Sequence, residues 1–285
     1  MLLSMVALRR NNHERTRRST RYHDTPAVWR TMLAIDERVV DIMGSLSVTG
    51  DIDDDLRGKP LLIAANHIGV FDALVLMAAC RRIGIAPRFM LAGGLLDAPV
   101  LGSALRRSGH LRVDRGSGMT AIEQFTHATE ALRASTVPLL VYPEGRISHD
   151  PGLWPERGKT GAARLALAAG VPVIPVSQWG AHEAVYWGTE TVSGLSDVLP
   201  LARSGLTSPV RRPTFQVHFG DPVELSDLDP ATPGTPWQAH KRIMRAITDG
   251  LVGLRRDEPD IPRFHDPTRP TDGTSPWRPN PEARN

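Results

Sequence analysis

Short apolar runs alternate with helix-like segments along most of this chain, and this alternation restricts its possible folds more than any other feature. A short apolar run bounded by turn residues indicates a buried strand, and apolar residues three or four positions apart indicate an amphipathic helix. Strands and helices that alternate in this way are typical of an α/β fold, in which helices cover both faces of a central, mostly parallel or mixed sheet. The predicted strands are 61–65, 88–92, 110–113, 137–142, 171–176 and 214–219, and the predicted helices beyond residue 50 are 70–80, 95–107, 120–134, 160–169 and 236–254.

The sequence divides into four predicted parts. Residues 1–24 form a basic tail that is predicted to be flexible, and 25–48 form an amphipathic helix with Pro26 in its first turn. Residues 49–254 form one α/β domain, which is long enough to bury a substantial core. Residues 255–285 contain seven prolines and balanced charge, and they are predicted to form a second flexible tail.

Positive charge is concentrated in the first tail. Six arginines and one glutamate lie within residues 1–21, so this stretch carries a net charge of +5, and because the whole chain carries +3 the remainder carries 3 − 5 = −2. A nearly neutral body argues against a nucleic-acid-binding surface on it, and the arginine run has no interleaved aromatic residues that could stack on bases. The arginines could bind an anionic membrane surface or remain solvated without a partner, and the sequence leaves both interpretations open.

The helix predicted over 25–48 has a broad apolar side. Most helices of this kind pack on their own domain, but the arginine tail and Trp29 also fit a helix that lies at a membrane surface. No stretch approaches the roughly 18 consecutive apolar residues that a membrane span requires. In residues 1–10 the arginines follow the apolar run, which is the wrong order for a secretory signal. A peripheral location without a membrane span is therefore expected.

The single cysteine, Cys80, excludes an intramolecular disulfide and fits a reducing compartment. It lies in an apolar helical segment, so we expect it to be buried and unreactive. No histidine or cysteine spacing suits a metal ion, so no metal site is expected.

The strand predicted over 61–65 ends abruptly in polar residues. Asn66 and His67 follow it directly, Gly69 permits a tight turn, and Asp72 lies in the first turn of the next helix. Side chains five apart on a regular helix diverge by about 140°, so His67 and Asp72 can meet only across an irregular corner. Such a pair suits a general base whose imidazole is held by a carboxylate. A histidine that merely satisfies its own corner is the alternative, and the spacing alone does not exclude it.

Two further strand ends carry candidate residues. Arg115 follows the strand over 110–113, and Pro143, Glu144 and Gly145 follow the strand over 137–142, where the glycine allows backbone N–H groups to turn towards a ligand. The strand over 171–176 is apolar and contains two prolines. Each segment alone is also explained by a surface arginine, a turn or an edge strand.

In this order and spacing, these segments resemble the four sequence blocks of the glycerophospholipid acyltransferase family, the 1-acyl-glycerol-3-phosphate acyltransferases and their relatives. The resemblance covers roughly residues 50–225. It rests on Asn66, His67 and Asp72 in the first block, Arg115 in the second, Pro143-Glu144-Gly145 in the third, residues 171–176 in the fourth, and the similar segment Lys159–Arg164 before it.

The resemblance implies that residues 49–254 are a catalytic domain that transfers an acyl group from acyl-CoA or acyl carrier protein to the hydroxyl of a lysophospholipid, most simply 1-acyl-glycerol-3-phosphate, giving phosphatidic acid. His67 would be the general base and Asp72 would orient it. Since the attacking hydroxyl belongs to the acceptor, neither a protein nucleophile nor a cofactor is needed. The family also implies a peripheral location on the cytoplasmic face of the cell membrane. The implied substrate-binding residues are Asn66, Arg115, Glu144, Gly145, Arg146 and Lys159.

Two positions depart from the family's pattern. The third block usually contains Gly-Thr-Arg-Ser, whereas here Arg146 directly follows Gly145 and Ile147 stands where arginine is expected. A lysine commonly follows the segment Phe89-Met90-Leu91, where this chain has Ala92. Another lyso-lipid or a glycolipid is therefore an alternative acceptor. A thioesterase-like hydrolase that uses the same pair on water, and a non-catalytic lipid-binding protein, are the two alternatives of a different class.

Overall fold

The computed structural model describes residues 25–92, 96–97, 101–113, 121–185, 195–256, 261–262, 264 and 269–279. The predicted basic tail over 1–24 lies outside these residues, and so does Arg115. Within the described part of the chain, no helix has the length and apolar character needed to cross a membrane.

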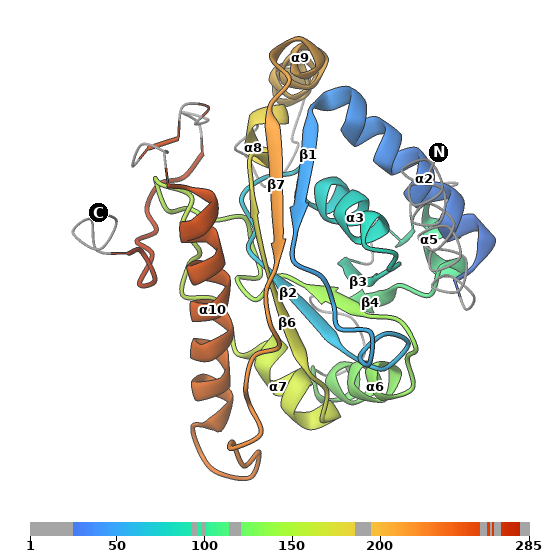
Figure 1. Ribbon diagram of the computed structural model, residues 1–285, viewed down its shortest axis with the longest axis vertical. Helices are drawn as coiled ribbons and strands as arrows, with labels where there is room; N and C mark the ends of the chain where they lie inside the picture. The colour runs from blue at the N-terminus through green and yellow to red at the C-terminus, as the bar shows by residue number, and fades with distance from the viewer. Residues whose placement is uncertain are drawn as a thin grey trace, which may run out of the picture.

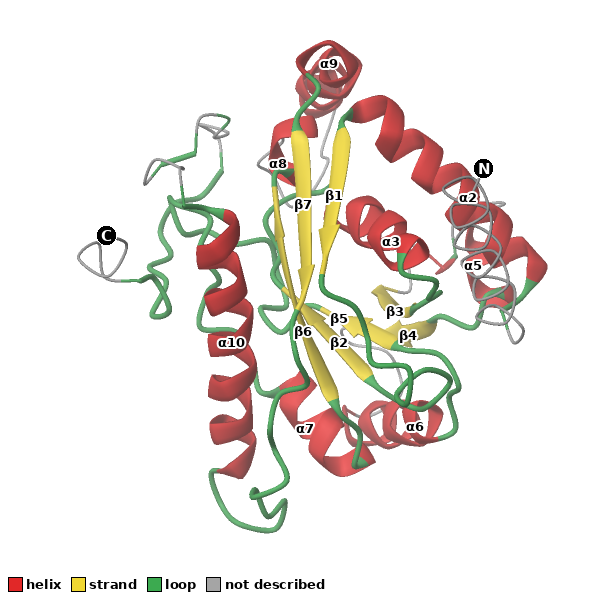
Figure 2. Cartoon of the chain, viewed as in Figure 1, coloured by secondary structure: helices red, strands yellow, loops and turns green. Residues whose placement is uncertain are grey.

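A seven-stranded mixed sheet forms the centre of the protein, in the order β1-β7-β6-β2-β5-β3-β4 (Figure 2). All neighbouring pairs are parallel except β6 and β7, which are antiparallel. The α/β fold with a mixed sheet is therefore confirmed. The strands are β1 (Ser45–Thr49), β2 (Leu62–Ala65), β3 (Arg88–Ala92), β4 (Leu111–Val113), β5 (Leu139–Val141), β6 (Val173–Trp179) and β7 (Thr214–Phe219).

Helices cover both faces of this sheet, as predicted (Figure 1). Side chains of β2 alternate between two apolar clusters, because successive residues of a strand point to opposite faces. Ile63 and Ala65 pack in the cluster that includes α2 and α3, whereas Leu62 and Ala64 pack in the cluster that includes α6, α7 and α10. The helices are α2 (Ala27–Met43), α3 (Asp72–Arg82), α5 (Leu101–Arg107), α6 (Ala121–Arg133), α7 (Gly161–Ala169), α8 (Ala181–Ala184), α9 (Leu195–Arg211) and α10 (Thr235–Leu254).

Cys80 lies in α3 and is fully buried, which agrees with an unreactive thiol. Burial raises the pKa of this thiol well above its usual value, and the charge of the nearby Asp36 raises it further. The thiolate, which is the reactive form of cysteine, is thereby suppressed.

The helix predicted over 25–48 is longer than the helix that the structure contains. α2 ends at Met43, and Ser45–Thr49 form β1, which pairs in parallel with β7. Three of the five residues of β1 are serine or threonine, so the strand lacks the apolar run that marks the other strands. The sequence also gave no sign of α9, since Pro200, Gly205 and Pro209 interrupt its helical pattern.

The prediction of a flexible tail over 255–285 is wrong for residues 269–279. Arg269 and Ser275 are buried, and their side chains donate hydrogen bonds to the backbone oxygens of Ile68 and Pro155, respectively. A high proline content does not prevent a segment from packing when its polar groups find partners on the domain.

Candidate active site

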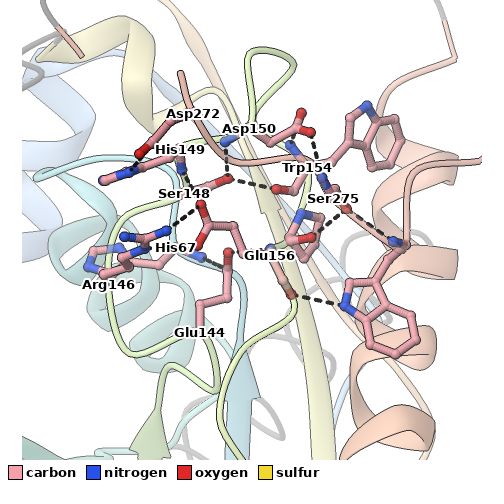
Figure 3. Close-up of polar contacts among 12 residues, drawn as sticks. His67, Glu144, Arg146, Ser148, His149, Asp150, Trp154, Glu156, Asp272 and Ser275 are labelled. Carbon is pink, nitrogen blue, oxygen red and sulfur yellow. Dashed lines mark hydrogen bonds and ion pairs between the residues drawn. The ribbon is translucent and has the colours of Figure 1, made fainter. Parts of the chain in front are cut away.

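The candidate site lies beyond the carboxyl ends of two neighbouring parallel strands, β2 and β5. β2 continues into Asn66 and His67, and β5 continues through Tyr142 into Glu144. Ligands of open α/β sheets commonly bind at this edge, where the loops leave the strands. Figure 3 shows the His67, Glu144 and Arg146 side chains gathered around the loop that follows β5.

His67 and Asp72 contact each other directly. His67 Nδ1 lies 2.8 Å from Asp72 Oδ2, the imidazole is 21% exposed, and the carboxylate is fully buried. The chain between them is not helical, because α3 begins only at Asp72 after a turn in which the Asp72 N–H donates to Gly69 O. The predicted strand-to-helix corner is therefore what brings two side chains five residues apart into contact.

The turn also fixes the Asp72 carboxylate. Besides His67, Oδ2 accepts hydrogen bonds from the backbone N–H groups of Ile68 (2.6 Å) and Gly69 (3.0 Å). The residue opens α3, where the helix dipole favours a negative charge. A carboxylate held in this way accepts a hydrogen bond from the Nδ1–H group of His67. Nε2 is then the ring nitrogen that carries a lone pair. The arrangement suits a general base.

Gly69 serves close packing and not a positive backbone φ angle. A Cβ atom at this position would lie 3.3 Å from Cα of His182 in α8. Glycine therefore lets the turn that carries the Asp72 hydrogen bonds approach α8 closely, and a larger residue would require a shift of a few tenths of an ångström.

Tyr142 stacks on the imidazole, with ring centroids 4.1 Å apart and an interplanar angle of 14°. Burial raises the pKa of this phenol well above its usual value, so it remains neutral. Tyr142 was not among the predicted site residues, although it stands directly before Pro143 in the third block. Its flat face limits the rotation of the base and provides an apolar wall beside it.

Glu144 ties the two active-site loops together. Its carboxylate accepts the backbone N–H of His67 at 2.7 Å and that of Glu156 at 2.8 Å, and only 4% of the residue is exposed. Glu144 is the third residue of a turn that begins at Tyr142. Pro143 is the second residue of this turn, and the N–H of Gly145, with φ +74°, donates to Tyr142 O. Ser148 N–H in turn donates to His67 O, so both backbone polar groups of His67 bind this loop.

Replacing Glu144 by glutamine should change the free energy of unfolding by an amount that depends on pH. Burial raises its pKa from 4.5 to about 8, so ionisation in the folded state is disfavoured and wild-type stability falls as pH rises between these values. In Glu144→Gln the amide nitrogen must face the backbone N–H of either His67 or Glu156. We therefore expect the free energy of unfolding at pH 5 to fall by about 1–3 kcal/mol relative to the wild type. This deficit should narrow towards pH 9, because only the wild type bears the cost of ionisation. Urea denaturation at both pH values measures it.

The matched control is Glu130→Gln on the exposed side of α6, which should change stability little at either pH. Comparison of wild type with Glu144→Gln isolates this group from Asp36, whose pKa burial also raises to about 8. A deficit that is absent, or that widens with pH, would contradict the role assigned to Glu144.

Arg146 and Lys159 lie on the same side of the site as Gly145. Arg146 forms a two-pronged ion pair with Glu156, with Nε at 2.8 Å and Nη2 at 3.2 Å from its oxygens, and the arginine side chain remains 45% exposed. Lys159 is exposed, and a Cβ atom at Gly145 would lie 3.8 Å from its Cδ. Both cations are therefore accessible to an anion. Glu156, which the sequence analysis did not single out, sets the direction of Arg146.

Asn66, in contrast, does not face the site. It is fully buried, and its amide exchanges two hydrogen bonds with the backbone of Gln178, whose own side chain donates to Asn66 O. These bonds join the end of β2 to β6, so the structure gives Asn66 a structural position instead of a substrate-binding one. The described residues contain no cluster of side chains that could hold a metal ion.

Comparison with known proteins agrees with the sequence blocks. Residues 47–179 match the protein family described as Acyltransferase. The chain is 29% identical over 133 residues to a 1-acyl-sn-glycerol-3-phosphate acyltransferase of Limnanthes douglasii, which covers 46% of this chain and 45% of that protein. It is 35% identical over 126 residues to the protein of that name from Escherichia coli K12, which covers 44% and 48%. The chain thus spans about half the length of these curated relatives.

The fold agrees as well. The structure superposes on the crystal structure of the 1-acyl-sn-glycerophosphate (LPA) acyltransferase PlsC from Thermotoga maritima with a TM-score of 0.54 and 19% sequence identity, covering 80% of this chain and 81% of that one. The family match over residues 47–179 includes part of β1, all of β2, β3, β4, β5 and β6, and the His67–Asp72 corner, so it contains the centre of the sheet and the site just described. Residues 47–179 of this chain therefore match the acyltransferase family, and the similar proteins named for this region are 1-acyl-sn-glycerol-3-phosphate acyltransferases.

Proposed function

We propose that this protein transfers a fatty acyl group from a thioester donor, acyl-CoA or acyl carrier protein, to the hydroxyl of a lysophospholipid. The observation that carries the proposal is the contact of 2.8 Å between His67 Nδ1 and the buried Asp72 carboxylate, with the imidazole still partly exposed. Relatives named 1-acyl-sn-glycerol-3-phosphate acyltransferases make 1-acyl-glycerol-3-phosphate the first acceptor to consider, with phosphatidic acid as its product.

The proposed reaction uses His67 twice. Nε2 removes the proton from the acceptor hydroxyl as its oxygen attacks the thioester carbonyl, and Asp72 stabilises the imidazolium that forms. When the tetrahedral intermediate collapses, the carbon–sulfur bond breaks and the imidazolium returns the proton to the departing thiolate. The products are the new ester and a free thiol, and His67 ends neutral as it began.

The cations beside the base provide a site for the acceptor's phosphate. Arg146 and Lys159 are exposed near Gly145, and the guanidinium can offer further N–H groups to a phosphate while it remains paired with Glu156. Arg115, which the family resemblance assigns to the same task, lies outside the described residues. A lyso-lipid with another headgroup, or a glycolipid, is the alternative acceptor.

A panel of acceptors identifies the substrate. Purified protein is incubated with a radiolabelled donor, which is acyl-CoA in one series and acylated acyl carrier protein in a parallel series. Each series tests 1-acyl-glycerol-3-phosphate, other lysophospholipids and a glycolipid as separate acceptors. Acceptor-dependent product is the expected result, with 1-acyl-glycerol-3-phosphate the best acceptor. Absence of transfer to every acceptor would end the proposal.

We further propose that the protein docks on the membrane that holds its acceptor. The outer side of α2 exposes four apolar residues at helical spacing, and α9, which contacts α2 through a hydrogen bond from Ser208 Oγ to Met43 O, exposes three more. A helix that buries one side in its domain and presents apolar residues on the other suits a lipid interface. The exposed residues are Val28, Ile35, Val39 and Ile42 in α2 and Leu199, Leu206 and Val210 in α9.

Replacing two of these residues tests the docking surface. In Ile35→Glu/Ile42→Glu we expect vesicle binding to fall at least about tenfold, because each change removes an exposed apolar side chain that would insert into the lipid and adds a charge. Flotation with anionic vesicles measures it, and Ile122→Glu, at an exposed site on α6, is the control. Binding equal to that of the wild type would show that the α2 side is not the membrane-facing one.

A further inference from the structure

Residues 269–277 lie across both loops of the candidate site. Arg269, which is 7% exposed, donates from Nη2 to the backbone oxygen of Ile68 at 2.7 Å. Trp277 Nε1 donates to Glu156 O at 2.9 Å. One short C-terminal segment therefore contacts the turn that follows the base and the loop that carries Glu156.

Several further contacts hold this segment in place (Figure 3). Asp272 Oδ1 lies 2.9 Å from His149 Nδ1, and Ser275 N–H donates to Asp150 Oδ2 at 2.9 Å. Asp150 Oδ1 in turn accepts the backbone N–H of Gly152, so the segment and the loop share one carboxylate. The segment is thus fixed at several points, and the position of Arg269 does not depend on a single contact.

The contact made by Arg269 bears on the base through one peptide group. The carbonyl that accepts its hydrogen bond belongs to the peptide between Ile68 and Gly69, and the N–H of that same peptide donates to Asp72 Oδ2. A cation on the carbonyl polarises the amide and strengthens its N–H as a donor, since linked hydrogen bonds reinforce one another. Arg269 is thereby connected through this peptide and Asp72 to His67 Nδ1.

We propose that Arg269 is a positioning residue of the acyl-transfer site: its guanidinium fixes the Ile68–Gly69 peptide and so holds Asp72 against the base. Its hydrogen bond to Ile68 O is the contact through which we expect Arg269 to act on the base. The inference rests on the proposed function for its kinetic consequences, whereas its structural part concerns the turn itself. Sequence gives no hint of it, since 201 residues separate Arg269 from Ile68.

Two substitutions in the full chain test the proposal. Arg269→Met keeps the apolar stem but removes the donor, and we expect kcat to fall at least about tenfold while KM for donor and acceptor changes little. Arg269→Lys keeps a cationic donor and should recover most of this loss. Hydrogen exchange followed by mass spectrometry should show faster exchange within residues 66–72 in Arg269→Met. The matched control is Arg256→Met, at an exposed arginine just beyond α10, which should alter neither quantity.

The outcomes separate this proposal from the proposed function. A folded Arg269→Met protein with wild-type kcat and wild-type exchange over 66–72 would overturn the positioning role, whatever the acceptor. If wild type transfers no acyl group at all, the proposed function fails, and the exchange measurement still decides whether Arg269 holds the turn. If Arg269→Met does not fold, Arg269→Lys decides. Wild-type kcat and wild-type exchange in Arg269→Lys support a role for a cationic donor at Ile68 O. A folded Arg269→Lys protein whose kcat falls as far as that of His67→Ala would overturn the positioning role.

Discussion

Replacing His67 by alanine is expected to lower kcat/KM for acyl transfer about a thousandfold, which corresponds to about 4 kcal/mol of transition-state stabilisation. The change removes the imidazole that contacts Asp72 and that we propose accepts the hydroxyl proton. The fold should persist, because the contacts of His67 with Glu144 and Ser148 are made by its backbone. Initial rates with acyl-CoA and the preferred acceptor, together with the thermal midpoint, measure both effects.

His127→Ala is the matched control, since His127 is exposed on α6 on the far side of the sheet from α3. It should retain full activity. Comparable rates for His67→Ala and the wild type, at equal amounts of folded protein, would remove His67 from the mechanism. A loss of activity accompanied by unfolding would instead assign His67 a structural role.

Replacing Asp72 by asparagine is expected to lower kcat about a hundredfold or more while KM changes little. Asparagine has nearly the same size, and its oxygen can still accept the Ile68 and Gly69 N–H groups. It carries no charge, so it stabilises the imidazolium poorly even when its oxygen takes the place of Oδ2 and still accepts a hydrogen bond from His67 Nδ1. The effect should appear in kcat because the imidazolium forms only during the reaction.

The control for this substitution is Asp55→Asn in the exposed turn before β2. A crystal structure or a thermal midpoint of Asp72→Asn shows whether the turn is retained. An unchanged kcat in a folded Asp72→Asn protein would show that the 2.8 Å contact with His67 has no role in the chemistry.

The sequence predicted the parts of this protein that depend on local pattern. Apolar runs located both ends of β2, β3 and β5 within two residues and those of β6 within three, because a buried strand needs a continuous apolar stretch. The strand-to-helix corner placed His67 against Asp72, and the order of the blocks identified the family, which the comparisons confirm. β1 was missed because its edge position tolerates the polar residues that hide a strand from this kind of analysis.

The rest of the site depends on contacts between residues far apart in the chain. Glu144 was assigned to the acceptor, yet both of its oxygens hold backbone N–H groups of His67 and Glu156. Asn66 was assigned to the substrate, yet its partner is Gln178 of β6. Arg269 lies in a segment that composition marks as a flexible tail. No local spacing encodes such pairs, so only the folded chain reveals them.

We propose that His67 activates a lipid hydroxyl, and not water, to accept the acyl group, and one reaction tests this directly. Thiol release from acyl-CoA and the esterified lipid are measured in the same reaction, with and without 1-acyl-glycerol-3-phosphate. The account predicts that thiol appears only when the acceptor is present, in a one-to-one ratio with phosphatidic acid. Thiol release at the same rate without the acceptor would identify a hydrolase and contradict the account.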